Sequence, residues 1–507
     1  MFTRRTFLAS GLATTFGAAD ALYRVGQAAA ADGPLLPDAV RFSDDIEPLV
    51  RLIEDTPRDK AVETLAVKLR DGLPYNQFVA ALFLAGIRNV NPQPPGFKFH
   101  CVYMIHSCNY LANTAPPEER LLPMFYVLDD FKRSQEEDIK LGDFVLRQRE
   151  GELPSGAAAW SELDAAMEAW DEDRADRAIT GLTREVDIDS IFARLWEYGA
   201  RDYRNIGHKI IYVSNAWRTL ETIGRQHAGP VLRSIILGLL DFGKDEVVNN
   251  YGYSDQCYHA NKRLADEAMG RMPDAWDGNT PNAAATEALI ADIRSGNFAE
   301  LCPAVVKRLQ DGGCQAHAVW DALHLAACEL MIGSPGVVGA HPVTSVNAMR
   351  FAFNTAKEPR TKLLLLLQGV GWTCQFRNFL PPKNAASGPI LALEAETIGE
   401  DADAACASVF DAIGPDTARA SRLALAFTQR HGAPRFIDTA RRLVFTKSTE
   451  HHMYKWPAAI FEDARLVTPE YLPRMLAASV YYIPGSDRRD TPVIQRAIEA
   501  MSAPKPA

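Results

Sequence analysis

Apolar residues recur at spacings of three and four along nearly the whole chain, from about residue 44 to residue 501. This spacing is the period of an α-helix with one buried face, and it differs from the strict alternation of a half-buried strand. Proline or glycine separates the apolar segments at short intervals, which ends one helix before the next begins. The sequence therefore predicts an all-α protein, a large array or bundle of helical hairpins that encloses a central site. The clearest segments are residues 47–53, 58–69, 75–85, 191–201, 230–240, 286–293, 362–368 and 417–429.

Two stretches interrupt this helical pattern. Glycine, proline, asparagine and acidic residues gather at residues 151–156 and 274–285. We interpret both stretches as loops within one domain, because candidate ligands fall on both sides of them and would have to meet. The prediction is a single large all-helical domain over residues 32–507. No stretch of this domain approaches the ~20 uninterrupted apolar residues that a stable membrane span needs.

The first residues have the features of an export address. Residues 3–8 read TRRTFL, a weakly apolar run follows to Ala19, and alanines fill positions 28–31. This order is typical of a twin-arginine signal peptide, which is removed and takes no part in the fold. We predict a signal peptide over residues 1–31, passage through the twin-arginine translocase, and a periplasmic or extracellular location. That route carries folded proteins, which suits a cofactor loaded in the cytoplasm.

Charge and composition exclude several classes of protein. The 507 residues are 47% hydrophobic and carry a net charge of −10, which becomes −12 when three arginines and one aspartate leave with the signal. This balance argues against nucleic acid or anionic membranes as partners. The eight cysteines contain no Cys-x-x-Cys pair and are too sparse for a disulfide scaffold, and their pairing stays open. No glycine fingerprint of a flavin or nicotinamide site is present.

Five of the eleven histidines stand at or near the head of apolar, helix-periodic stretches: His106, His208, His317, His341 and His452. Three of them, His106, His208 and His341, each open a helix-like stretch that is followed by a second apolar segment, as in a repeated hairpin. Imidazoles delivered from separate helices into one interior are what a transition metal needs. We therefore predict a buried metal centre with these five ligands, and iron as its metal. Lys455 shares a helical face with His452, since residues three apart are neighbours.

Four stretches carry a resemblance to a known family. They are HSCNYL at 106–111 with PPE at 116–118, GGCQAHAV at 312–319, HPVT at 341–344 with NAMR at 347–350, and EHHMYK at 450–455. Their order and character are similar to those of the questin oxidase-like family, and they span about two-thirds of the chain. The resemblance implies a helical, non-haem Fe(II) oxygenase that opens a polycyclic aromatic or quinone-like ring with dioxygen.

The resemblance also implies roles for particular residues. Carried over, the ligands would be His106, His317, His341 and His452, with Lys455 as a carboxylated lysine. His208 has no counterpart in the family, and only the internal repeat indicates that it is a ligand. Pro457 departs from the family pattern, because proline usually begins or breaks a helix, and Lys447 then becomes a rival to Lys455.

The chemistry of such a centre suggests further roles. One coordination position must stay open for dioxygen or substrate. Arg350 would steady a developing oxyanion, and Thr344 or Tyr454 would pass protons. The predicted partners are therefore a small aromatic substrate and dioxygen.

Other interpretations of the same residues stay open. Each histidine could instead be a hydrogen-bonded core residue, and His324 could replace His317 as a ligand. We interpret His100 as a loop or helix-end residue, and His451 as the solvent-side neighbour of His452. A metal-free helical-repeat binding protein of the cell envelope would use the same hairpins. A haem protein would need only one or two of the histidines, but the sequence lacks Cys-x-x-Cys-His.

Overall fold

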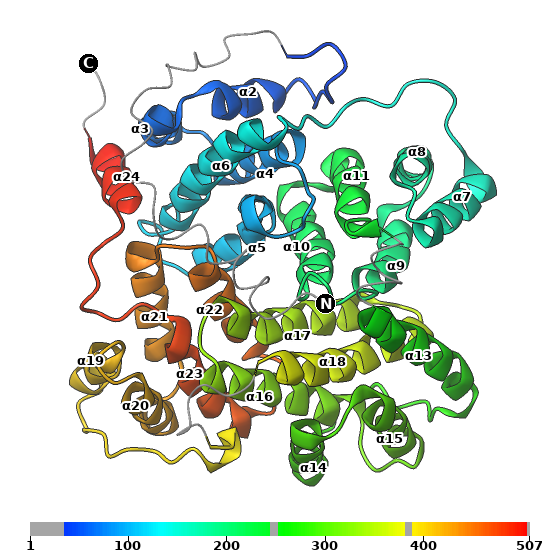
Figure 1. Ribbon diagram of the computed structural model, residues 1–507. Coiled ribbons are helices and arrows are strands. Elements are labelled where there is room, and N and C mark those ends of the chain that lie inside the picture. The colour runs from blue at the N-terminus through cyan, green and yellow to red at the C-terminus, as the bar shows by residue number, and fades with distance from the viewer. Residues whose placement is uncertain (1–34, 244–251, 381–387, 504–507) are drawn as a thin grey trace.

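The computed structural model describes residues 35–243, 252–380 and 388–503 (Figure 1). The signal peptide predicted for residues 1–31 lies outside these ranges. Among the described residues every regular element is a helix, and the one β-type contact is an isolated bridge between Ala39 and Arg147. The prediction of an all-α fold is confirmed.

The helices follow one another with short connections. In the first part of the chain they are α2 (Glu47–Asp55), α3 (Arg58–Arg70), α4 (Tyr75–Asn89), η1 (Phe97–Phe99), α5 (His100–Asn113), α6 (Leu122–Leu141), α7 (Gly156–Ala169), α8 (Glu172–Leu182), α9 (Ile188–Gly199), α10 (His208–Ile223), η2 (Arg225–His227) and α11 (Ala228–Leu239). Then come α13 (Gly252–Ala268), η3 (Met269–Arg271), α14 (Ala283–Ser295), α15 (Phe298–Gln310), α16 (Ala316–Gly333), α17 (Val337–Thr355) and α18 (Pro359–Phe379). The last are η4 (Ile390–Ala392), α19 (Ala402–Ala412), α20 (Thr417–His431), α21 (Pro434–Lys447), α22 (His452–Asp463), η5 (Pro469–Tyr471), α23 (Leu472–Ser479), η6 (Val480–Tyr482) and α24 (Pro492–Ser502).

Local sequence explains where many of these helices begin. An Asp or Asn side chain accepts a hydrogen bond from the backbone N–H three residues later at the start of six helices, which satisfies one of the donors left free there. These residues are Asp171, Asp187, Asn282, Asn297, Asp401 and Asp416. The predicted loop at 151–156 separates α6 from α7, and most of the second, at 274–285, precedes α14.

Four helices form the centre of the fold. α5 packs against α10, α10 against α17, α17 against α22, and α22 against α5, so that the four close a ring. Three of them also pack against the next helix in the chain, in the pairs α5–α6, α10–α11 and α17–α18, as the predicted hairpins require. Residues 363–367, five consecutive leucines of α18, are all buried, which is typical of a helix surrounded by other helices. Among the described residues, no helix combines the length and the apolar character needed to cross a bilayer.

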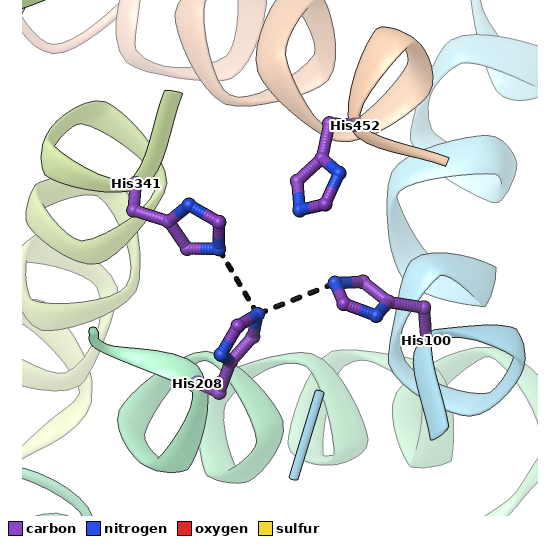
Figure 2. Close-up of side chains that lie close together, drawn as sticks. All are labelled: His100, His208, His341 and His452. Atoms are coloured by element: carbon purple, nitrogen blue, oxygen red, sulfur yellow. Dashed lines mark hydrogen bonds between the residues drawn. The ribbon is translucent and has the colours of Figure 1, made fainter. Parts of the chain in front are cut away.

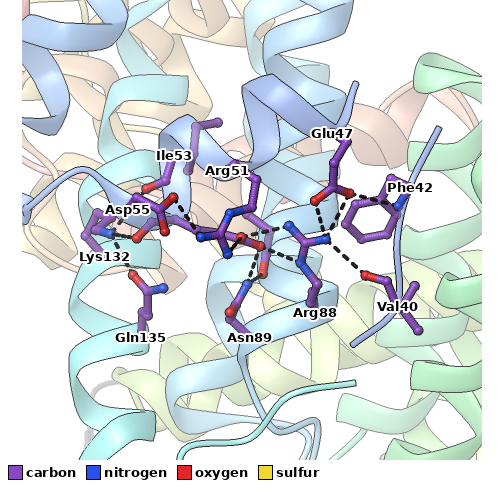
Figure 3. Close-up of polar contacts among 12 residues, drawn as sticks. Val40, Phe42, Glu47, Arg51, Ile53, Asp55, Arg88, Asn89, Lys132 and Gln135 are labelled. Atoms are coloured by element: carbon purple, nitrogen blue, oxygen red, sulfur yellow. Dashed lines mark hydrogen bonds and ion pairs between the residues drawn. The ribbon is translucent and has the colours of Figure 1, made fainter. Parts of the chain in front are cut away.

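A buried ionic network fixes α2 to this framework (Figure 3). The Arg88 guanidinium of α4 is fully buried and donates to the Glu54 carboxylate at 2.7 and 2.8 Å and to that of Glu47 at 2.8 Å. It also donates to the carbonyl of Val40 at 3.0 Å. Lys132 of α6 donates to the Glu54 carbonyl at 2.7 Å, near the C-terminal end of α2. Polar groups that are buried in this way must find partners, and this network joins three helices through them.

Candidate metal centre

Four imidazoles meet where the four central helices begin (Figure 2). His100 is the first residue of α5, His208 the first of α10 and His452 the first of α22, while His341 lies in the second turn of α17. One ring nitrogen from each of the four lies within 4.8 Å of the others. All four residues are buried, with exposed fractions of 3%, 7%, 4% and 1% in that order. Imidazoles far apart in the sequence therefore converge on one point in space, as the prediction requires.

The second nitrogen of each ring is held by an oxygen. Nδ1 of His100 lies 2.7 Å from the Phe97 carbonyl. Nδ1 of His208 lies 2.7 Å from the Asn205 carbonyl, and Nδ1 of His341 lies 2.7 Å from the Val337 carbonyl. In His452 it lies 2.8 Å from the Glu450 carboxylate. Carbonyl and carboxylate oxygens only accept hydrogen bonds, so each Nδ1 must carry the proton and donate it. Every neutral ring then presents an Nε2 lone pair, the form in which histidine binds metals.

These lone pairs point at one another. Nε2 of His208 lies 3.0 Å from Nε2 of His341 and 3.2 Å from Nε2 of His100, and Nε2 of His452 is buried with no hydrogen-bond partner among the described residues. Two acceptors at this distance need a positive charge between them. A proton is a poor candidate, since burial holds the pKa of all four imidazoles well below the usual value and that of His341 at about 3.

A metal ion satisfies these atoms. At a metal–nitrogen distance of about 2.1 Å, neighbouring ligands at a right angle lie about 3.0 Å apart and opposite ligands about 4.2 Å apart. The observed Nε2–Nε2 distances of 3.0 and 3.2 Å match the spacing of neighbouring ligands. The remaining nitrogen atoms lie within 4.8 Å of one another, which is compatible with the spacing of opposite ligands. The cluster can hold a metal ion through four Nε2 atoms.

Glycines allow the backbone to approach this cluster closely. Gly96 has a φ of +152°, and a Cβ placed there would lie 3.3 Å from the ring of His208. Gly207, directly before His208, has a φ of +92°, and a Cβ there would collide with the Ser345 hydroxyl. Both conformations are ones that residues with a side chain rarely adopt. The two glycines thus position the first turn of α10, and with it the His208 ring.

Glu450 orients His452 and caps its helix. Its carboxylate accepts hydrogen bonds from the backbone N–H groups of His452 and Met453, both at 3.0 Å, besides the one from the His452 ring. Glu450, His451 and His452 also offer three atoms close enough to share a metal ion. However, the oxygens of Glu450 are already used by three donors, so we assign this carboxylate to holding His452 in place.

Lys455 lies one helical turn after His452 and is buried. Its amine has no hydrogen-bond partner among the described residues and lies 4.8 Å from the centre of the Tyr103 ring. Burial lowers the pKa of Lys455 to about 7, against a smaller raising effect of Glu450. The centroid of the Tyr103 ring lies 5.0 Å from that of His100 and 5.8 Å from that of His208, so Lys455 lies beside the cluster. α22 continues through Pro457, so the proline does not turn Lys455 away.

Two of the predicted ligands lie elsewhere. His106 is six residues beyond His100 on α5, which turns it by roughly 240° and moves it roughly 9 Å along the helix. Its Nε2 lies 3.6 Å from the Glu462 carboxylate. His317 of α16 contacts the Thr468 hydroxyl at 3.0 Å and Asp321 at 3.5 Å. Neither is in the four-histidine cluster, and His324, the alternative to His317, lies 3.4 Å from Asp463 instead.

The other residues predicted to act in catalysis make their contacts with groups other than the four imidazole rings. Thr344 lines a small cavity of about 10 Å³ together with Lys455, but its hydroxyl contacts its own helix at the carbonyls of Ala340 and His341. The guanidinium of Arg350 lies over the rings of Trp320 and Phe353. The Tyr454 hydroxyl donates to the carbonyl of Phe445 at 3.4 Å, and its ring packs against Tyr126. Lys447, the rival of Lys455, pairs with Asp490.

A large pocket ends beside the cluster without touching the four ligands. This outer pocket, of about 1630 Å³, is lined by residues of α2, α6 and α24 and by Thr449, Glu450 and His451 just before α22. Glu450 bonds to one ligand of the cluster, and the His451 ring stacks on another, His100. The outer pocket therefore ends at the wall of the metal centre.

The buried imidazoles predict how stability depends on pH. Their pKa values are below those of the unfolded chain, so the unfolded state takes up protons first as the pH falls below about 6.5. Each imidazole should then remove up to about 1.4 kcal/mol of stability per pH unit. Buried carboxylates such as Asp463, whose pKa is raised, act in the opposite direction. We expect the free energy of unfolding of the metal-free protein, measured with urea, to fall less steeply between pH 6.5 and 4.5 in His341→Gln than in the wild type. The difference in slope should correspond to at most one proton. Equal slopes would contradict the assignment.

Comparison of the sequence with known protein families and with curated proteins gave no match, and comparison of the fold with solved structures gave none either. The evidence for function is therefore the site itself: four buried imidazoles on four helices, oriented to bind a metal ion.

Proposed function

We propose that this protein is an exported non-haem iron oxygenase that acts on an aromatic or quinone-like substrate with dioxygen, ring opening being the expected outcome. The observation that carries the proposal is the set of four tethered imidazoles, whose Nε2 lone pairs face one another at 3.0 and 3.2 Å. The preference for iron and for an aromatic substrate rests on the resemblance of residues 106–118, 312–319, 341–350 and 450–455 to the questin oxidase-like family.

Lys455 supports the choice of an oxygenase centre. Four neutral imidazoles supply no negative charge to a divalent ion, and no carboxylate or thiolate belongs to the cluster. An amine whose pKa is lowered to about 7 is about half uncharged at neutral pH, and an uncharged amine is the form that combines with carbon dioxide. We propose that Lys455 carries a carboxylate group and is the fifth ligand. Bound iron would then supply the means to activate dioxygen at the remaining position.

The protein's own residues would prepare the site for this chemistry. The three helices that begin at the cluster direct their N-terminal N–H groups towards it, which favours neutral imidazoles and an anionic partner at the open position. Burial of all four rings excludes bulk water from the ion. Thr344 lines the small cavity with Lys455, and its hydroxyl oxygen could accept a hydrogen bond there while its own proton is donated within α17. The outer pocket is large enough for a polycyclic substrate.

Two alternatives fit the site less well. A haem places its flat macrocycle between two axial ligands, whereas here four nitrogen atoms within 4.8 Å of one another leave no space for such a ring. A metal-free binding scaffold would leave lone pairs facing each other in the core, and each unpaired buried polar group costs about 1–3 kcal/mol.

Purified protein tests the proposal directly. We expect about one iron per chain by elemental analysis, no Soret band, and substrate-dependent dioxygen uptake with hydroxylated quinones. The His341→Ala variant should lose both the iron and the dioxygen uptake. A Soret band would favour a haem protein, and a folded chain without stoichiometric metal would favour a scaffold. Stoichiometric metal without dioxygen uptake on any quinone would keep the metal centre and refute the oxygenase.

A further inference from the structure

A fifth imidazole closes the inner end of the outer pocket. The ring of His451 lies nearly parallel to that of His100, with 3.7 Å between centroids and 23° between planes. Its centroid lies 4.4 Å from that of His452. His451 also lines the outer pocket, and it is more exposed than the four ligands. It is therefore the one imidazole of the five that touches both the ligand set and the outer pocket.

His451 differs from the four ligands in how it is held. Each ligand ring is fixed through Nδ1 by a hydrogen bond to a carbonyl or a carboxylate. Nδ1 of His451 is buried and has no hydrogen-bond partner in the described part of the chain. An unpaired buried nitrogen costs about 1–3 kcal/mol, and rotation into the outer pocket would let water remove that cost. Ring contacts with His100 and His452 hold the closed position of His451, and no hydrogen bond to Nδ1 adds to them among the described residues.

The space under His451 has a defined shape. A ring stacked at 3.7 Å occupies a slot one aromatic ring thick over His100. With His451 rotated away, a planar ring from the outer pocket could stack in the same slot, because offset stacking is a favoured arrangement of aromatic rings.

We propose that His451 is a gate between the outer pocket and the metal centre, and that the slot it fills admits a planar aromatic ring against His100. This gate rests on the proposed function only in requiring that the four histidines hold a metal ion. It determines which molecules reach that ion, and it selects them by shape: flat rings enter by displacing His451, while very small molecules pass beside it.

Cobalt(II) offers a test that needs no knowledge of the substrate. Protein loaded with Co(II) is mixed with azide, a small linear probe, or with pyridine, a planar ring, and the change in the visible spectrum gives the binding rate. A gate open about a tenth of the time would slow ring entry about tenfold, so His451→Ala should bind pyridine about tenfold faster. The azide rate should change by less than about twofold. His451→Trp, with a larger stacking ring, should slow pyridine.

Controls separate the gate from other effects. Lys140→Ala removes a side chain from the same pocket without touching His100, and should leave both rates unchanged. Equal pyridine rates in wild type and His451→Ala, or equal acceleration of azide and pyridine, would overturn the gate. If His451→Ala does not fold, an unchanged pyridine rate in His451→Trp overturns it instead. A wild-type protein that binds no Co(II) refutes the metal centre itself, which the missing spectrum reveals before any rate is measured.

Discussion

Replacing His208 with alanine is expected to empty the metal centre. His208 lies in the middle of the ligand set, since its Nε2 is in contact with those of both His341 and His100. Mutation of a residue that only orients a ligand typically weakens metal affinity about 10- to 100-fold, and loss of a ligand should exceed the upper value. Metal content after dialysis against a weak chelator should fall from about one ion per chain to a small fraction. Elemental analysis measures it.

Two matched variants control this experiment. His106→Ala removes a partly buried histidine and His317→Ala a buried one, but these pair with Glu462 and with Thr468 and should leave the metal content unchanged. Circular dichroism should show full helicity in all three proteins. Full metal content in folded His208→Ala, or loss of metal in His317→Ala, would refute the ligand set that the structure brings together.

The helical fold is readable from the sequence because helix formation is largely local. The period of three and four that predicts helices at residues 58–69 and 75–85 corresponds to α3 and α4, and the boundaries differ by only a few residues. The pairing of α10 with α11 and of α17 with α18 also follows from short connections, which leave consecutive helices few other neighbours.

The ligand set is only partly readable, because convergence depends on packing between distant segments. His208, His341 and His452 stand out as histidines at the head of apolar helices, and the structure brings them together. His100 carries the same signal in a weaker form: it begins α5, and Gly96 with a positive φ precedes it, as Gly207 precedes His208 and Gly336 precedes His341. A search for a glycine followed within five residues by a histidine at a helix start would have identified His100. His106 lies on the same apolar helix as His100. Which of the two histidines faces the cluster depends on how α5 is oriented towards the other three helices, and the sequence does not reveal that orientation.

Arg88→Met should produce the largest loss of stability. The guanidinium is fully buried, and the Glu54 carboxylate that it binds has a side chain only 2% exposed. Burial already raises the pKa of Glu54 despite the guanidinium beside it, so without Arg88 the carboxylate would be buried unpaired or would take up a proton. Removing one partner of a buried pair typically costs about 3–5 kcal/mol. Urea unfolding should show a loss of this size.

Two further variants test whether the buried charge is the cause. Arg496→Ala breaks a partly exposed pair with Glu63 and should cost at most about 1 kcal/mol. Replacing Glu54 with leucine in the Arg88→Met background should recover part of the loss, because no unpaired carboxylate then remains. Glu54 and Lys132 line the outer pocket, so Arg88→Met should also loosen this part of the pocket wall. If Arg88→Met cost no more than Arg496→Ala, the network would not be what holds α2 against α4 and α6.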